Sequence, residues 1–274
     1  MIPPPPVTRV ARSAWGLAGI SSGERAIAEE TAIAFTYDHA AHAVMMATPT
    51  DLEDFAVGFS LTEGIVASAS EIESLDVVPV EAGVELRMSI TLARSDALFR
   101  RRRLLSGPTG CGLCGIDSLQ EAMRRPPQVR SDFRITAKAI AASVASMRSR
   151  QILNHQTHAL HAAAFWEPNR GLIALREDVG RHNALDKLAG TLARASLTAA
   201  RGVIILTSRI SVELVQKAAV MGAPVIAAIS APTALAVRTA EQARITLVGI
   251  ARDDGFEIFS CDDRIDTSTM SHVA

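Results

Sequence analysis

The pattern of apolar and polar positions differs between the two halves of the chain. In the first hundred or so residues, apolar and polar positions alternate over short stretches, the pattern of half-buried strands. The predicted strands are Thr31 to Tyr37, His42 to Ala47, Leu75 to Val80 and Val84 to Thr91. Thr50 and Glu53 precede an apolar stripe at helical spacing, so we expect a helix capped by Thr50 and ending near Gly64. This half is predicted to be small and α+β.

In the second half, short continuous apolar runs alternate with helical patterns of about ten residues, which favours an α/β sheet. The predicted strands are His158 to Trp166, Gly171 to Arg176, Gly202 to Leu206, Pro224 to Ile229, Thr246 to Ala251 and Phe256 to Ser260. The predicted helices are Ile135 to Arg150, with Thr136 available near its start as a cap, and Arg181 to Leu188, Ser211 to Met221 and Thr233 to Ala243. We expect three layers around a largely parallel sheet, in which ligands bind at the carboxyl ends of strands.

Two predicted strand-to-helix junctions are unusually polar. They are Glu177 to Lys187 and Thr207 to Glu213, and each combines an arginine with hydroxyl or amide side chains at a helix start. Backbone N–H groups and an arginine at a helix start suit a phosphate or another anion. Helix capping with surface ion pairs is the plainer interpretation. The chain has neither a Gly-x-x-x-x-Gly-Lys-Ser/Thr loop nor a Gly-x-Gly-x-x-Gly motif, which argues against standard NTPases and Rossmann dehydrogenases.

Composition narrows the class of protein. The 274 residues are 48% hydrophobic and 21% charged, as in soluble globular proteins, and the net charge of −1 gives no general attraction to nucleic acid or membrane. Only 4% are aromatic, so platforms for stacking bases are scarce. Three cysteines argue against a disulfide scaffold. Met1 to Ile20 does not resemble a signal peptide, and we expect a cytoplasmic protein.

The stretch Ser106 to Gly115 holds two of the three cysteines, Cys111 and Cys114, in the densest glycine cluster of the chain. Arg100 to Arg103 stand just before it, and nearby cations favour the thiolate form of cysteine. We interpret this stretch as a mobile loop that carries reactive sulfur to a partner. A short helix is expected from Ser118 to Met123.

Two other interpretations of the cysteine pair stay open. The pair could bind zinc in an adaptor together with histidines, although His155, His158 and His161 fall where a strand is predicted and cannot all face one ligand. Retained stoichiometric zinc would favour that function. The pair could also form a reversible redox disulfide, for which a defined reduction potential would be the sign.

The sequence resembles the FdhD/NarQ family of formate dehydrogenase accessory proteins. The resemblance runs in order from about residue 25 to 260. It rests on Thr48 to Phe59, Glu63 to Ile65, Cys111 to Gly115, Glu177 to Lys187 and Thr207 to Ser211. One departure is Thr157 to His161, where the family often has Thr-Gly-Gly-x-His and this chain lacks both glycines.

The resemblance implies a sulfur carrier. Such a protein takes persulfide sulfur from a cysteine desulfurase and passes it to the molybdenum or tungsten bis(guanine dinucleotide) pterin cofactor of formate dehydrogenase. Cys111 would bear the persulfide and Cys114 would assist it. A homodimer is implied as well. The implied cofactor contacts are Arg181, His182, Asn183, Lys187, Thr207, Ser208, Arg209, Ser211 and the stretch Ile250, Ala251, Arg252, Asp253, Asp254 and Gly255.

The resemblance also implies a cytidine-deaminase-like fold for the second half, without deaminase chemistry. A zinc deaminase has His-x-Glu at one helix start and Pro-Cys-x-x-Cys at the next. The corresponding places here hold His182 to Ala184 and Thr207 to Arg209, with neither the glutamate nor the thiolates. We therefore expect no intrinsic metal. The predicted organisation is an irregular arm (1–24), a small α+β domain (25–103), the Gly/Cys loop with a short helix (104–125) and the deaminase-like domain (126–274).

Overall fold

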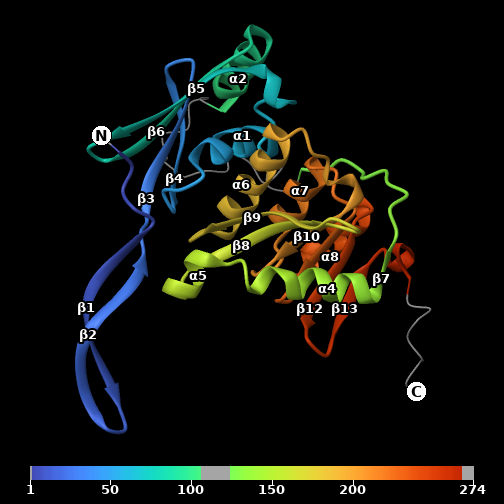
Figure 1. Cartoon of the computed structure of the whole chain (residues 1–274). Helices are drawn as coiled ribbons and strands as arrows, with labels where there is room; N and C mark the ends of the chain where they lie inside the picture. Colours follow the sequence, from blue (N-terminus) through green and yellow to red (C-terminus); the bar gives the residue numbers. More distant parts are fainter. Residues whose placement is uncertain (1, 106–123, 267–274) are drawn as a thin grey trace.

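The chain begins with a two-stranded arm that stands away from the rest of the protein (Figure 1). The computed structural model describes residues 2–105 and 124–266. β1 (Val7–Gly16) and β2 (Gly19–Ala28) pair antiparallel along their whole length, with Leu17 and Ala18 at the turn. The prediction of an irregular arm over residues 1–24 is therefore wrong. Neither face of the arm is buried, so it lacks the alternating apolar pattern by which a strand is recognised in a sequence.

Residues 31–90 form a four-stranded sheet with one helix packed on its inner face. The sheet order is β4-β3-β6-β5, from β3 (Thr31–Tyr37), β4 (Ala40–Ala47), β5 (Ile72–Val80) and β6 (Gly83–Ile90). The helix is α1 (Leu52–Thr62), and a short 3₁₀ turn (Ala69–Glu71) precedes β5. The Phe35 ring stacks on Phe59 with centroids 4.1 Å apart and meets Phe55 edge-on at 5.0 Å. The four predicted strands and the helix are confirmed. α2 (Leu92–Leu105) follows β6.

The start of α1 differs from the prediction. Its first residue follows Asp51, which has a φ of 51°, and no side chain caps the helix. Thr50 donates its hydroxyl to the Asp51 carboxylate (2.6 Å), so the expected Thr50 cap is wrong. Contacts from the second half of the chain explain the difference. Asp178 accepts from the Thr48 backbone N–H (3.0 Å) and Lys187 donates to the Thr48 carbonyl (2.8 Å), which fixes the chain path into the helix.

The second half is built on a six-stranded sheet of order β13-β12-β11-β10-β8-β9. Its strands are β8 (His161–Glu167), β9 (Gly171–Asp178), β10 (Val203–Leu206), β11 (Val225–Ala228), β12 (Thr246–Arg252) and β13 (Gly255–Ser260). Only the β10–β11 and β11–β12 pairs are parallel; the other three are antiparallel. The predicted largely parallel sheet is thus corrected to a mixed one. One helix connects β10 to its parallel neighbour β11 and another connects β11 to β12, whereas β8–β9 and β12–β13 are hairpins, which pair antiparallel.

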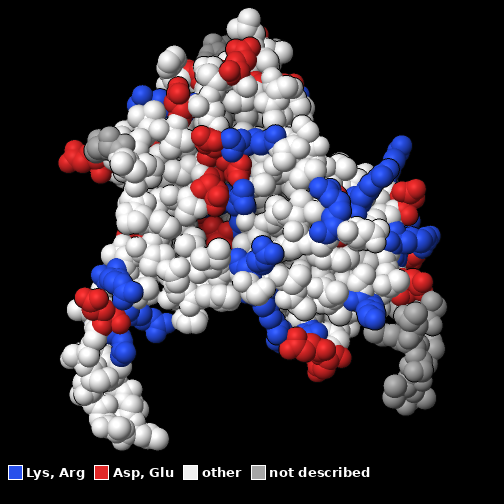
Figure 2. All heavy atoms as spheres, in the orientation of Figure 1, with Lys and Arg blue, Asp and Glu red and all other residues white. Residues whose placement is uncertain are grey.

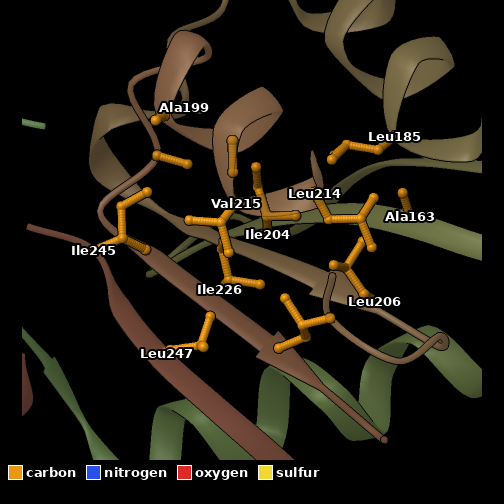
Figure 3. Packing of buried hydrophobic residues seen from close by; sticks show 14 of the residues in the cluster. Ala163, Leu185, Ala199, Ile204, Leu206, Leu214, Val215, Ile226, Ile245 and Leu247 are labelled. Carbon is orange, nitrogen blue, oxygen red and sulfur yellow. The ribbon is translucent and has the colours of Figure 1, made fainter. Parts of the chain in front are cut away.

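Helices cover both faces of this sheet, which confirms the predicted three-layer α/β arrangement. α6 (Arg181–Arg194), α7 (Val212–Val220) and α8 (Ala234–Ala243) lie on one face, and α4 (Ala137–Arg148) lies on the other (Figure 1). Successive residues of the buried strands serve opposite faces. Ile204 packs against Leu214 and Val215 of α7, as Figure 3 shows, whereas Ile205 packs on the opposite face, toward α4. Thr136 caps α4 by accepting from the Ala139 N–H, as predicted.

The three histidines His155, His158 and His161 do not lie in one strand. His155 belongs to a short helix, α5 (Ile152–Thr157), and His158 ends that helix with a φ of 57°. Only His161 is in β8, so the strand predicted to start at His158 begins three residues later. The remaining elements are β7 (Ile135–Thr136), which pairs with β14 (Ile265–Asp266), and two 3₁₀ turns, Ala199–Arg201 and Asp262–Arg264.

The two halves meet where α1 crosses α6. A Cβ atom at Gly58 would lie 1.7 Å from the Asp186 carbonyl oxygen, and one at Gly190 would lie 1.8 Å from the Asp54 carbonyl oxygen. Both glycines are therefore required for the backbones to approach. Among residues 2–105 and 124–266, none of the helices has both the length and the apolar character needed to cross a membrane.

Candidate functional site

The two polar junctions predicted from the sequence meet at one edge of the six-stranded sheet. The first residue of β8, His161, pairs with Asp178 at the end of β9, and Ala163 pairs with Leu206 at the end of β10. α6 and α7 therefore begin side by side. His182 in the first turn of α6 contacts the residue before α7, with 3.2 Å between its Nε2 and the Ser211 hydroxyl. This contact confirms that the two junctions form one surface.

His182 is also paired with a carboxylate of α7. Its Nε2 lies 2.7 Å from Glu213 Oε2. The hydrogen bond from His182 holds the pKa of Glu213 below its ordinary value. His182 is thereby fixed between the two helix starts, where it tethers α6 to α7.

Arg181 and Arg209 make this edge cationic. Arg181 is the first residue of α6, and its Nε atom is buried with no hydrogen-bond partner in the described part of the chain. Arg209 is exposed in the loop before α7. Burial and the charge of Arg181 lower the pKa of nearby His161, so that imidazole stays neutral to lower pH than usual. Two arginines beside two helix N-termini form an arrangement that can bind an anion.

Thr207 and Ser208 shape the loop between the arginines. The Thr207 hydroxyl accepts from the Ala162 N–H (2.9 Å), which ties the loop to β8. Ser208 is buried and donates to the Arg209 carbonyl oxygen (3.2 Å). Thr207 is half-buried, so of these two residues it is the one that reaches the surface.

The stretch Ile250 to Gly255 lies at the same edge of the sheet. The loop after β10 bridges to the loop after β11, because Ile210 donates to the Ala231 carbonyl (3.2 Å). That second loop contacts the end of β12, where the Ile250 N–H donates to the Ser230 carbonyl (3.2 Å). Ile250 has a φ of 53°, an uncommon backbone conformation for a β-branched residue and one often found at functional sites. The three loops therefore form one continuous rim.

Residues within Ile250 to Gly255 differ in accessibility. Ala251 is buried against the α4 side of the sheet. Arg252, Asp254 and Gly255 are exposed at the turn. Asp253 is exposed too, and its carboxylate lies 3.0 Å from Arg148 of α4.

Asn183 and Lys187 point into the protein. The Asn183 amide donates to the Met46 carbonyl (2.9 Å) and to Asp178 (3.0 Å). Lys187 is fully buried, 2.6 Å from Asp178. The two residues are four apart, which places them on one face of α6. Helical spacing in the sequence could have distinguished these two inward-facing residues from Arg181 and His182, because the same buried face of α6 continues to Gly190.

The comparison with known proteins agrees with this architecture. The model of the FdhD/NarQ family matches residues 28–266. A sulfur carrier protein FdhD from Agrobacterium fabrum is 52% identical over 258 residues, covering 94% of this chain and 95% of that protein. The chain belongs to the FdhD/NarQ family.

Further relatives span the same length. A sulfur carrier protein FdhD from Cupriavidus necator is 45% identical over 262 residues, covering 96% of this chain and 91% of that protein. The fold matches a crystal structure from Desulfotalea psychrophila, described as a proposed formate dehydrogenase accessory protein, with a TM-score of 0.76 and 23% identity. That match covers 96% of this chain and all of the other, and it supports the fold alone.

The cysteine pair of this family member lies outside the described residues. Cys111 and Cys114 fall within 106–123, as does the helix expected from Ser118 to Met123. The backbone of Arg100 to Arg103 belongs to α2. The carrier role of the cysteines, and the zinc and redox alternatives, therefore stay predictions.

Arg124, the first described residue after the cysteines, is fixed between the two halves of the chain. The Arg124 guanidinium donates to the Thr62 carbonyl (3.1 Å). The Gln216 side-chain amide donates to the backbone carbonyl of Arg124 (3.0 Å). This anchor lies next to a polar cluster that sequence reasoning missed. Lys217 contacts Glu63 (2.6 Å) and Asp186 (2.9 Å). Burial alone would lower the pKa of Lys217, but the attraction of these two carboxylates raises it.

A second missed cluster holds α1 against α6 and β9. The Asp54 carboxylate accepts from Arg176 (2.7 Å), Arg194 (2.7 Å) and the Thr191 hydroxyl (2.9 Å). Burial works against the ionised form, but these hydrogen bonds outweigh it and the pKa of Asp54 is lowered. Many of the residues in the family motifs thus hold the two halves of the chain together. Fewer of them contribute to the exposed rim.

Proposed function

We propose that this protein is a sulfur carrier in the maturation of formate dehydrogenase. The observation that carries the proposal is its 52% identity, over 94% of the chain, to a protein named sulfur carrier protein FdhD. The Cys-x-x-Cys pair at Cys111 and Cys114 supplies the chemistry that such a role requires. A thiolate is needed both to take up sulfur and to release it.

Sulfur uptake takes place on Cys111. Its thiolate attacks the terminal sulfur of a persulfide on a cysteine desulfurase. The S–S bond of the desulfurase breaks, its cysteine leaves as thiolate, and the transferred sulfur ends as a persulfide on Cys111 with the proton it carried. Arg100 to Arg103, just upstream in the sequence, favour the thiolate of Cys111, and Cys114 assists the transfer.

The acceptor is the molybdenum or tungsten bis(guanine dinucleotide) pterin cofactor, bound as a client before it enters formate dehydrogenase. Its pyrophosphates suit the cationic rim, where Arg181 has a buried Nε atom without a hydrogen-bond partner among the described residues. Arg209, Thr207 and Ser211 stand beside it at the start of α7, with His182 between the two helices. The stretch Ile250 to Gly255 continues the rim toward the guanine end.

This proposal narrows the set of cofactor contacts inferred from the sequence. Asn183 and Lys187 have internal partners and are left to hold the two halves together. Ala251 is buried on the α4 side, so its neighbours Ile250 and Arg252 are the better candidates for contact. Two copies of the chain would form the working homodimer, with a cysteine desulfurase and formate dehydrogenase as transient partners.

Replacement of the cysteine tests the function in cells. Cys111→Ala is expected to abolish formate dehydrogenase maturation in a strain that lacks its own copy, because no other group accepts the sulfur. Cys261→Ala is the matched control. Cys261 is partly buried, and burial raises the pKa of its thiol, so its loss should leave maturation unchanged. Full maturation by Cys111→Ala, with the variant present at normal levels, would contradict the proposal.

A further inference from the structure

The β1–β2 arm ends in an apolar tip that no part of residues 2–105 and 124–266 covers. Trp15, Leu17 and Ile20 are 79%, 103% and 77% exposed. Trp15 and Ile20 are direct cross-strand partners, so their side chains share one face. No charged residue occurs from Ser13 to Gly23, and Figure 2 shows the end of the arm, at lower left, without charged side chains. A two-stranded hairpin is only marginally stable in water, and a cluster of exposed large apolar side chains marks a binding surface.

A groove with an apolar lining lies beside the free edge of β9. It measures about 380 Å³. Its apolar lining is Ile152, Leu153, Leu172, Ile173, Ala174 and Leu175, and its charged lining is Asp51, Arg150, Arg176 and Glu177. β9 is the terminal strand of the sheet in the described part of the chain, so its outer edge offers backbone N–H and C=O groups to an incoming strand. Ile152, at the start of α5, is 66% exposed.

The arm and the groove occupy the same side of the molecule. β2 contacts α5, the helix that contributes Ile152 and Leu153 to the groove. No residue of the arm is among those that line the groove of its own chain. A two-fold axis through this side would therefore bring each arm to the groove of the other copy, which is the reciprocal geometry of a closed dimer.

Charge and area both favour an arm in a groove. The shaft of the arm carries Arg9, Arg12 and Arg25 against Glu24, so two arms packed on each other would repel. The groove lining has Asp51 and Glu177 beside Arg150 and Arg176, so it carries no net charge that would repel an arm. Three large apolar side chains bury roughly 500 Å² per arm. Two arms and the groove surfaces that they cover bring the total to about 2,000 Å², the size of a stable interface.

We propose that the β1–β2 arm of one copy binds along β9 and α5 of a second copy, with Trp15, Leu17 and Ile20 in its groove, and that the exchange is reciprocal. The inference rests on the homodimer of the proposed function and locates its interface. It also gives the arm a role that the sulfur chemistry does not require.

Dilution of the full chain, followed by light scattering or sedimentation, tests the interface. The wild type is expected to be a dimer at micromolar concentration. The double variant Trp15→Ser/Leu17→Ser and the groove variant Ile152→Glu should each raise the dimer dissociation constant at least 100-fold. Leu92→Ser is the matched control, because Leu92 is 86% exposed on α2 and belongs to neither surface. Circular dichroism shows whether each variant is folded.

Mixing the two variants adds a test that a general loss of stability would not pass. A mixed dimer keeps one intact contact, between the arm of the groove variant and the groove of the tip variant, so mixing should restore association that neither variant shows alone. A monomeric wild type, or tip and groove variants that dimerise like Leu92→Ser, would overturn the proposal. Sulfur loading of Cys111 is measured separately on the same samples. A monomer that accepts sulfur defeats the interface and the homodimer but leaves the carrier function standing. A dimer that accepts none defeats only the carrier function.

Discussion

Arg209 is the rim residue that best separates ligand binding from folding. Its side chain is exposed in the loop before α7, whereas Arg181 is partly buried at the start of α6. Hydrogen bonds from an arginine to a phosphate are charge-assisted and stronger than those between neutral groups. Removal of Arg209 should therefore weaken binding of a nucleotide and leave the fold unchanged.

The prediction is that Arg209→Ala binds GDP about tenfold more weakly, a loss of about 1.4 kcal/mol. Isothermal calorimetry on the full chain measures it. Arg170→Ala is the control, because Arg170 pairs with Glu167 at the opposite end of the β8–β9 hairpin (2.7 Å). Equal affinities for the wild type and Arg209→Ala would remove Arg209 from the site.

Lys187 is the residue for which sequence and structure suggest different roles. The resemblance places it among the cofactor contacts, but its ammonium group is fully buried against Asp178. Truncation of one partner of a buried ion pair leaves the other charge uncompensated, which costs about 3–5 kcal/mol. We expect Lys187→Ala to lower the free energy of unfolding by about this amount.

Urea unfolding measures the effect, with Lys138→Ala on the exposed surface of α4 as the control. Lys138→Ala should change the free energy of unfolding by less than about 0.5 kcal/mol. If Lys187→Ala were as stable as the wild type but bound GDP more weakly, the structural role given to Lys187 here would be wrong.

At the scale of elements, the crossing of α1 and α6 depends on two glycines. A methyl group at Gly58 would lie 1.7 Å from the Asp186 carbonyl oxygen, which is backbone and cannot rotate away. We predict that Gly58→Ala lowers the free energy of unfolding by about 3 kcal/mol, at the upper end of overpacking effects. Thermal or urea unfolding measures it.

Gly23→Ala is the control for the glycine prediction, since a Cβ at Gly23 meets nothing within 4 Å. A Gly58→Ala protein as stable as Gly23→Ala would show that the two helices can separate at little cost. It would also mean that the halves are less tightly joined than the contacts of Asp54 and Lys217 indicate.

Local signals in the sequence predicted most elements, and tertiary contacts account for the main failures. The cap at Thr136 is local chemistry and is confirmed. The start of α1 was misplaced because Asp178 and Lys187 hold Thr48 from the other half of the chain. The arm was missed because its strands bury neither face, so no alternating pattern marks them.

At the scale of the whole molecule, the polar end of the sheet was predictable from the sequence. Which of its polar residues face outward was not. Two polar strand-to-helix junctions were predicted in one sheet, and the contact of His182 with Ser211 shows that they lie together. Which polar residues face outward depends on how α6 packs against α1, and one sequence does not reveal that partner. The predicted boundaries between the domains, at 25–103 and 126–274, stay a prediction about folding units.

The central claim is that Cys111 carries sulfur. The most direct measurement is intact and peptide mass spectrometry of the full chain after incubation with a cysteine desulfurase and cysteine, with and without a reductant. The account predicts a gain of one sulfur atom on the Cys111 peptide, removed by the reductant and absent in Cys111→Ala. An active desulfurase that leaves the wild-type chain without added sulfur, or that loads only Cys261, would contradict it.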